Sequence, residues 1–264
     1  MTQILRRSAL SVSAVGLSLI AFTALSSRPI VAQSPEFELR RVIDVQLKPD
    51  RMAEWTRLHR DEMLPALKKG GLPWLDVWTS AAAGNPYMRT LVSPVTAASE
   101  LDFAGVVQRA LGVEKGADLM ARNRDLVTGV QAYIMRVRPD LGFGTAPSAR
   151  SIGVLSTITA GNGRAAEVET LMKTTVADSL KEANVGSYVV LQLVFGGDPN
   201  QYRTVLSFRN VEAPASGHPN PLVYLAKEQH QIELGSVARQ VDSPVAHLER
   251  TIITYLPDLS YRPE

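Results

Sequence analysis

The sequence predicts an α+β fold made of two successive βαββαβ units. A tight turn followed by an Arg-Thr strand occurs twice, at residues 84–91 and 197–206. Around each turn, strand-like alternation and helix-like spacing of apolar residues follow one another in the same order. Both halves also end in Pro-Asp-Leu, at residues 139–141 and 257–259. A repeated order with repeated turns and ends indicates an internal duplication.

The first 32 residues are typical of a secretory signal peptide. Arg6 and Arg7 precede a mostly apolar run at 9–25, and small residues precede Gln33. We expect cleavage after Ala32 and a periplasmic or extracellular mature protein. A retained membrane anchor is the alternative, which the serines within the apolar run disfavour. The paired arginines leave open either the general or the twin-arginine export route.

Charge and composition exclude several classes of function. Cleavage of the leader removes three of the 28 basic residues (28 − 3 = 25) and no acidic residue. The mature chain then has 25 basic and 26 acidic residues. A nearly neutral protein is not expected to bind nucleic acid. The chain has no cysteine, which excludes disulfides, thiolate metal sites and cysteine nucleophiles.

The first predicted unit spans residues 33–143. Alternation in 41–47 predicts a half-buried strand, and Asp50 is placed to cap the helix that follows. The remaining elements are expected to follow that strand in the order helix, strand, strand, helix, strand, at 51–69, 72–82, 87–93, 97–127 with a break near Gly112 and Gly116, and 130–138.

The second predicted unit spans residues 151–264 and follows a Gly/Pro/Ser/Ala linker at 144–150. Its elements are expected at 152–160, 164–183, 186–195, 202–209, 222–241 and 245–256. Glu54 and Glu167 differ by the same number of positions as Gly84 and Gly197 (167 − 54 = 113; 197 − 84 = 113). This constant spacing supports the duplication.

Two βαββαβ units of this size are ferredoxin-like units, each with one sheet face covered by helices and one bare. The simplest cover for a bare face is the bare face of the other unit. The tandem pattern resembles the dimeric α/β-barrel superfamily in a fused form, like NIPSNAP-like or uncharacterised members. That resemblance implies cofactor-free monooxygenase or isomerase chemistry on aromatic or hydrophobic molecules, or haem binding as in chlorite dismutases. No catalytic motif of one family is matched.

The face away from the helices is where we expect a ligand site. Strand alternation assigns to it aromatic, charged and polar side chains: Asp44, Gln46, Trp74, Asp76, Trp78, Arg89, Gln131, Tyr133, Thr157, Thr159, Arg203, His247, Glu249 and Thr251. Of these, Asp44, Arg89, His247 and Glu249 are the candidate catalytic residues, because a carboxylate beside an imidazole suits general base catalysis. Structural ion pairs and rim residues are the competing interpretation. Trp74 and Trp78 could equally stack on a flat ligand or lie in a contact between chains.

Three further histidines have different expected roles. His59 lies on an apolar helical stripe, and its counterpart in the repeat is Met172, so we expect it to be packed in the core. His230 lies on the stripe of the last helix and is the candidate axial ligand of the haem alternative. His218 is expected in a solvated loop. No residue spacing predicts a metal site or a phosphate loop.

The sequence therefore predicts an exported small-molecule-binding barrel protein, either a cofactor-independent monooxygenase or an isomerase for an aromatic or hydrophobic compound. The alternatives are a non-catalytic binding or assembly module and a haem protein. Partners are expected to be a small molecule and a second copy of the chain, with no nucleic acid and no membrane span after cleavage.

Overall fold

The predicted order of strands and helices is present wherever the chain can be described. The computed structural model describes residues 38–144, 152–182, 186–208 and 242–263. We call residues 38–144 the first half and residues 152–263 the second half. Both belong to one unit, Phe37–Glu264. The leader and the predicted helix at 222–241, with His218 and His230, lie outside the described residues.

The first half contains four strands and two helical segments. Its elements are β1 (Leu39–Leu47), η1 (Pro49–Arg51), α1 (Met52–Leu58), η2 (His59–Met63), α2 (Leu64–Lys69), β2 (Asp76–Ala83), β3 (Met88–Pro94), η3 (Ala98–Leu101), α3 (Phe103–Leu111), α4 (Val113–Asp125) and β4 (Val127–Val137). The predicted break at Gly112 separates α3 from α4, where a φ of 86° favours glycine. Asp50 lies inside η1 and makes no capping hydrogen bond, so the predicted cap is wrong.

The second half repeats this order as far as it is described. Its elements are β5 (Ile152–Ala160), α5 (Ala165–Leu171), η4 (Met172–Val176), α6 (Ala177–Glu182), β6 (Ser187–Phe195), β7 (Gln201–Phe208), β8 (Val245–Tyr255) and η5 (Pro257–Leu259). In each half the first long helix contains one π-helical turn, beginning at His59 and at Met172 (172 − 59 = 113). The spacing of 113 residues seen in the sequence therefore also separates the π-helical turns of the two halves.

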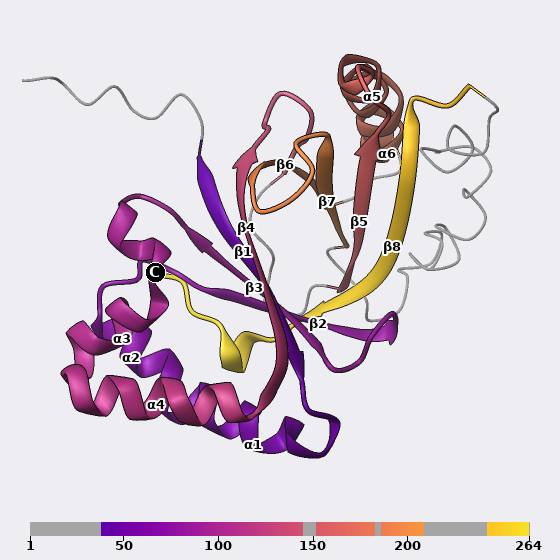
Figure 1. Ribbon diagram of the computed structural model, residues 1–264. Coiled ribbons are helices and arrows are strands. Elements are labelled where there is room, and N and C mark those ends of the chain that lie inside the picture. The colour runs from indigo at the N-terminus through magenta and orange to yellow at the C-terminus, as the bar shows by residue number, and fades with distance from the viewer. Residues whose placement is uncertain (1–37, 145–151, 183–185, 209–241, 264) are drawn as a thin grey trace, which may run out of the picture. The chain divides into compact units, whose positions relative to one another are not determined.

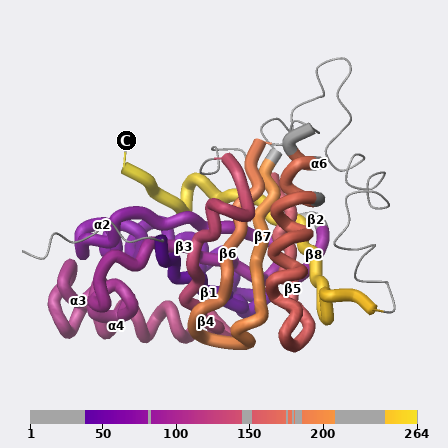
Figure 2. The backbone as a smooth tube through the Cα atoms, turned by 90° about the horizontal axis from the view of Figure 1, so that it is seen from above, coloured from indigo at the N-terminus to yellow at the C-terminus, as the bar shows by residue number. Residues whose placement is uncertain are grey.

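Eight antiparallel strands close into a barrel in the order β1-β3-β2-β8-β5-β7-β6-β4. Four neighbouring strands come from each half, and the pairs β2–β8 and β4–β6 join the halves. Figure 1 shows α1 to α4 on the outside of the first four strands and α5 and α6 outside the last four, and Figure 2 shows the same strands from above. The chain is therefore a mixed α+β protein with an antiparallel sheet.

Alternation along the strands separates an outer and an inner set of apolar residues. Outside the barrel, each half packs its own helices on its own strands, in clusters that include Trp55 and Leu91 in one half and Ile158 and Tyr202 in the other. Inside the barrel, two smaller clusters are centred on Val42 and Met135 and on Trp78 and Tyr255. Burial of these side chains is the main stabilising contribution.

The segment that ends each half packs against the other half. Leu259, after β8, belongs to the outer cluster of the first half, and Leu141, after β4, belongs to that of the second. Tyr261 pairs with Leu75 before β2, just as Phe143 pairs with Tyr188 in β6. We call 138–143 and 256–262 the exchanged tails. Each outer core is therefore completed by residues from the opposite half.

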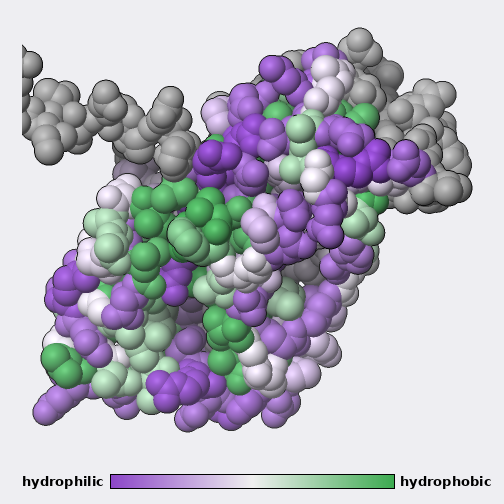
Figure 3. All heavy atoms as spheres, turned by 45° about the horizontal axis from the view of Figure 1, so that its top comes forward, coloured by the Kyte–Doolittle hydropathy of each residue, from purple (hydrophilic) through white to green (hydrophobic). Residues whose placement is uncertain are grey.

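The surface is mixed in character. Figure 3 shows one face, on which hydrophobic side chains, in green, gather in patches between hydrophilic regions, in purple. The large apolar residues that stay exposed in the described part of the chain are Leu101, Val113, Val130, Val194 and Phe195. No helix among the described residues is long and apolar enough to cross a membrane.

Candidate functional site

The inner face of the barrel carries a small polar group formed by both halves. Asp44 on β1 lies opposite Thr90 on β3, and Thr157 on β5 lies opposite Arg203 on β7. The Asp44 carboxylate accepts a hydrogen bond from Thr90 Oγ1 at 2.8 Å through Oδ1 and one from Arg203 Nη2 at 2.6 Å through Oδ2. An ion pair thus joins the two halves inside the barrel.

Tyr133 on β4 completes this group. The Arg203 guanidinium lies over its ring, with 4.2 Å between Cζ and the ring centroid, a cation–π distance. Burial raises the pKa of the Tyr133 phenol, and the nearby Arg203 opposes this rise. Arg203 Nε and Nη1 are buried and have no hydrogen-bond partner among the described residues. We call Asp44, Thr90, Tyr133 and Arg203 the interior polar cluster.

Two apolar clusters share the inner face with the interior polar cluster. One contains Val42, Met135, Leu191 and Leu193, and the other contains Trp78, Ile253 and Tyr255. Trp78 and Tyr255 contact each other edge to face, with 5.1 Å between ring centroids. The predicted placement of Trp78 inside the barrel is confirmed. The polar cluster therefore lies in surroundings of low polarity, where its electrostatic interactions are strengthened.

Asp76 and Trp74 hold one of the exchanged tails. Asp76 is 3% exposed, on the inner face of β2, and accepts hydrogen bonds from Arg262 and from the Tyr255 hydroxyl. Trp74, half-buried just before β2, lies near the guanidinium groups of both Arg40 and Arg262. These contacts favour a structural role for both residues, the interpretation that the sequence left open.

Arg89 lies on the opposite face from the one predicted. It pairs with Val45, so it points toward the helices, and its Nη1 donates to Thr79 Oγ1 at 2.7 Å and to two backbone carbonyls. Burial lowers the pKa of its guanidinium. The repeated Arg-Thr pair was misleading because the second turn is one residue longer. Tyr202, not Arg203, occupies the position of Arg89 (202 − 89 = 113), and a shift of one residue reverses the face.

The other predicted site residues lie toward one end of the inner face. Gln131 pairs with Asp44 across β4 and β1, while Glu249 pairs with Thr157, and His247 with Thr159, across β8 and β5. Gln131, His247 and Glu249 are exposed, whereas Gln46, Thr157, Thr159 and Thr251 are half-buried. Gln46 accepts a hydrogen bond from Asn85. The catalytic roles of His247 and Glu249 stay predictions.

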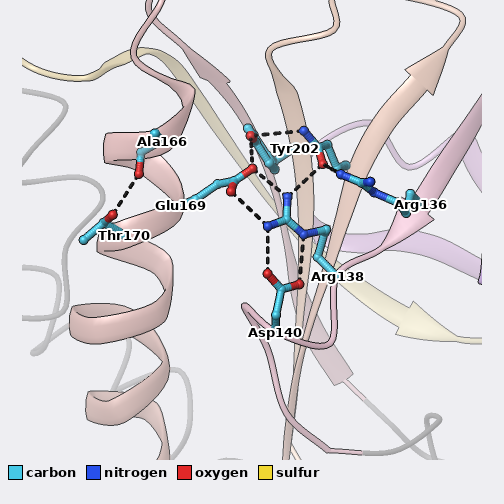
Figure 4. Close-up of polar contacts among 8 residues, drawn as sticks. Arg136, Arg138, Asp140, Ala166, Glu169, Thr170 and Tyr202 are labelled. Atoms are coloured by element: carbon cyan, nitrogen blue, oxygen red, sulfur yellow. Dashed lines mark hydrogen bonds and ion pairs between the residues drawn. The ribbon is translucent and has the colours of Figure 1, made fainter. Parts of the chain in front are cut away.

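A second polar group lies on the outer face of the second half and was not predicted. Glu169 on α5 accepts hydrogen bonds from the Tyr202 hydroxyl at 2.7 Å and from Arg138, which also binds Asp140. Figure 4 shows Glu169 reaching from the helix toward Arg138 and Tyr202, with Arg136 beyond. Hydrogen bonds to Asp140 and Glu169 raise the pKa of Arg138. No spacing in the sequence indicates this group, because its members come from three separate segments.

His59 is packed in the core, as the sequence predicts. Its ring stacks on Trp55 at 4.7 Å, and Nε2 donates to the Leu259 carbonyl at 3.2 Å. Burial lowers its pKa from 6.5 to about 4, so the ring is neutral at neutral pH. Among the described residues, no group of three or more acidic or histidine side chains could hold a metal ion.

No protein-family model and no curated protein matches the sequence. Solved structures do match its fold. A candidate monooxygenase from Fusobacterium nucleatum is 12% identical, with a TM-score of 0.57 over 86% of this chain and 99% of that chain. A candidate monooxygenase from Lactobacillus acidophilus is 9% identical, with a TM-score of 0.51 over 86% and 97%.

A chlorite dismutase from Candidatus Nitrospira defluvii, in complex with imidazole, is 10% identical, with a TM-score of 0.52 over 84% of this chain and 92% of that chain. At such low identity these similarities concern the fold, because one fold carries many activities. The eight-stranded barrel, the outer helices and these neighbours agree, and the chain has the fold of the dimeric α/β-barrel superfamily.

Proposed function

We propose that the protein is an exported small-molecule-binding barrel protein with the chemistry of a cofactor-independent monooxygenase or an isomerase. Its site is the interior polar cluster, and its ligand is an aromatic or hydrophobic compound that can lose a proton. The observation that carries the proposal is Arg203, a buried cation with Nε and Nη1 left without a partner in the described part of the chain. Unpartnered buried donors are costly and are rarely kept without a use.

The chemistry follows from the two charged groups. Asp44 takes a proton from the ligand, and the Arg203 guanidinium stabilises the oxyanion that forms, because charge-assisted hydrogen bonds are strong in apolar surroundings. Returning the proton to another atom gives isomerisation. Alternatively, dioxygen adds to the electron-rich anion. With 1-naphthol, the ligand supplies the electrons, one oxygen atom enters the ring to give 1,4-naphthoquinone, and the other leaves as water.

We also infer that the chain arose by duplication of a ferredoxin-like unit, with units at 33–143 and 151–264 and a linker at 144–150. The support is the constant spacing of paired positions: Thr79 and Gln192, like Arg89 and Tyr202, lie 113 residues apart (192 − 79 = 113). On this proposal, the interior polar cluster lies where two ancestral copies met.

Binding tests the proposal most directly. Trp78, inside the barrel, allows 2-naphthoate and its neutral analogue 2-naphthamide to be titrated by tryptophan fluorescence. We expect Arg203→Gln to weaken naphthoate binding by about tenfold to a hundredfold, the worth of a hydrogen bond to a charged group, and to leave naphthamide binding unchanged. Arg57→Gln, an exposed arginine on α1, is the control and should change neither. Equal naphthoate affinity in wild type and Arg203→Gln would refute the site.

Turnover is tested by oxygen consumption and quinone absorbance with 1-naphthol. We expect Asp44→Asn to abolish both, with near-ultraviolet circular dichroism confirming that the fold is kept. Substituting His247 or Glu249, which are exposed, tests the earlier expectation that they take part. Turnover that survives in Asp44→Asn would remove Asp44 from the mechanism.

The non-catalytic module remains a second candidate because buried apolar side chains contact one another inside the barrel, in two clusters. Naphthoate binding without turnover would favour it. The haem alternative depends on His230, outside the described residues, and stays a prediction. A Soret band after haem addition that is lost in His230→Ala would support it.

A further inference from the structure

One edge of β4 is open over its first part. Along β1, β4 pairs from Val127 to Arg136, but along β6 it pairs only from Ile134 to Val137. Near the end of the open part, Gln131 donates to the carbonyl of Gly196 in the β6–β7 turn. The backbone groups on the free edge from Val127 to Gln131 therefore meet no strand in the described part of the chain.

This stretch is exposed on both faces of the sheet. All five residues from Thr128 to Ala132 are exposed, although alternate side chains of a strand point to opposite faces. Val130 is 59% exposed. Beside the same edge, at the end of β6, Val194 and Phe195 are 40% and 67% exposed. Apolar area and free backbone groups thus occur together.

The open edge lacks the features by which proteins prevent strand pairing. Residues 127–133 include no charged side chain and no proline. The corresponding part of β8, which pairs with β2 only from Ile252 onward, carries His247, Glu249 and Arg250. One of two similar edges is therefore protected by charge and the other is not.

We propose that the β4 edge is the surface through which two copies of this chain associate, by antiparallel pairing of β4 with β4 of the second copy about a two-fold axis at Val130. In this register Val130 faces its own copy and Gly129 faces Gln131, and the paired stretch ends before Ala132, which lies against Gly196. All these side chains are uncharged and none is large, so the two identical strands can pair without charge repulsion or steric overlap of their side chains. A two-fold contact requires such self-complementarity, which a charged edge would not provide.

The test is the molecular mass in solution of the mature chain, measured by analytical ultracentrifugation over a wide range of concentration. Wild type is expected to be a dimer. Val130→Lys places two ammonium groups opposite each other and should raise the dimer dissociation constant by about tenfold or more. Val113→Lys is the matched control, because Val113 is 71% exposed at the start of α4, and it should remain a dimer.

A charge exchange separates loss of the interface from loss of the fold. Val130→Glu alone should weaken the dimer to the same degree, and mixing it with Val130→Lys should restore a dimer containing one of each, since opposite charges then meet at the axis. A monomeric wild type, an unchanged Val130→Lys, or a mixture that stays monomeric would each overturn the proposal.

Discussion

The position of Asp44 in the first half corresponds to Thr157 in the second, and that of Thr90 corresponds to Arg203 (157 − 44 = 113; 203 − 90 = 113). Each half therefore keeps one charged residue and one threonine at the same two places. The resulting ion pair joins unlike halves. Two copies of the first half would place each Asp44 opposite a threonine, and two copies of the second half would place each Arg203 opposite a threonine, so neither arrangement would pair the charge. The halves therefore differ at these two positions in a way that favours pairing of a first half with a second half over pairing of two identical halves.

Breaking this ion pair should have the largest effect. Asp44→Ala leaves Arg203, which is 6% exposed, without its counter-charge, and we expect a loss of about 3–5 kcal/mol in the free energy of unfolding. Urea denaturation measures it. The double substitution Asp44→Thr with Arg203→Thr makes both halves alike and removes both charges. It should lose clearly less than the sum of the two single changes, and an additive loss would contradict the coupling.

The exchanged tails test whether the halves unfold together. Leu141→Ala removes a leucine from the outer core of the second half and should cost about 2–4 kcal/mol. All three tryptophans lie in the first half, at positions 55, 74 and 78. If the halves unfold as one, the urea transition followed by tryptophan fluorescence shifts as much as the one followed by circular dichroism. A fluorescence transition that stays in place would mean independent halves.

His59 and Met172 begin the same π-helical turn, but only His59 titrates. Burial lowers its pKa from 6.5 to about 4, so the unfolded chain binds a proton at a higher pH than the folded protein does. Stability is complete above pH 6.5 and is lost as the pH falls toward 4. We expect this residue to contribute a loss of about 2 kcal/mol between pH 7 and pH 5. His59→Met should lose less stability over this interval, and an identical pH profile would contradict the assignment.

The smallest expected losses of unfolding free energy concern two arginines, each of which forms ion pairs with two carboxylates. Arg122 contacts Glu62 and Asp118 on the surface of the first half, and its side chain is 44% exposed. Arg138 contacts Asp140 and Glu169, and its side chain is 14% exposed. Arg138→Gln should cost about 1.5 kcal/mol. Arg122→Gln should cost about 0.5 kcal/mol or less, because water screens exposed pairs. Equal losses in urea denaturation would show that burial does not decide the difference.

Much of the fold could be predicted from local patterns. Strand β5 has the predicted bounds, Ile152–Ala160, because an apolar run next to a Gly-rich turn is a local signal. The π-helical turns at His59 and Met172 could not be predicted, since their apolar spacing fits an ordinary helix as well. The exchange of tails was also missed. Pro-Asp-Leu predicts the end of a strand, but which core receives the leucine depends on contacts distant in sequence.

The candidate site could be predicted only in part. Alternation placed Asp44, Trp78, Tyr133 and Arg203 on the inner face, but the one-residue difference between the turns reversed the face of Arg89. The partner of Asp44 was also missed. Nothing in the sequence indicates Arg203 as this partner, because only the closed barrel brings β7 within reach of β1. The cluster of Glu169 and Arg138 had no signal, since ion pairs between distant segments leave no trace in one sequence.

The exchanged tails also bear on how the protein is made. Leu259, which follows β8 in the second half, contributes to the core of the first half. The half synthesised first therefore remains incomplete until the segment that follows β8 has been synthesised. If the leader directs export by the general route, the first half stays open while the chain is threaded through a membrane channel, and its final packing waits until the segment after β8 has emerged.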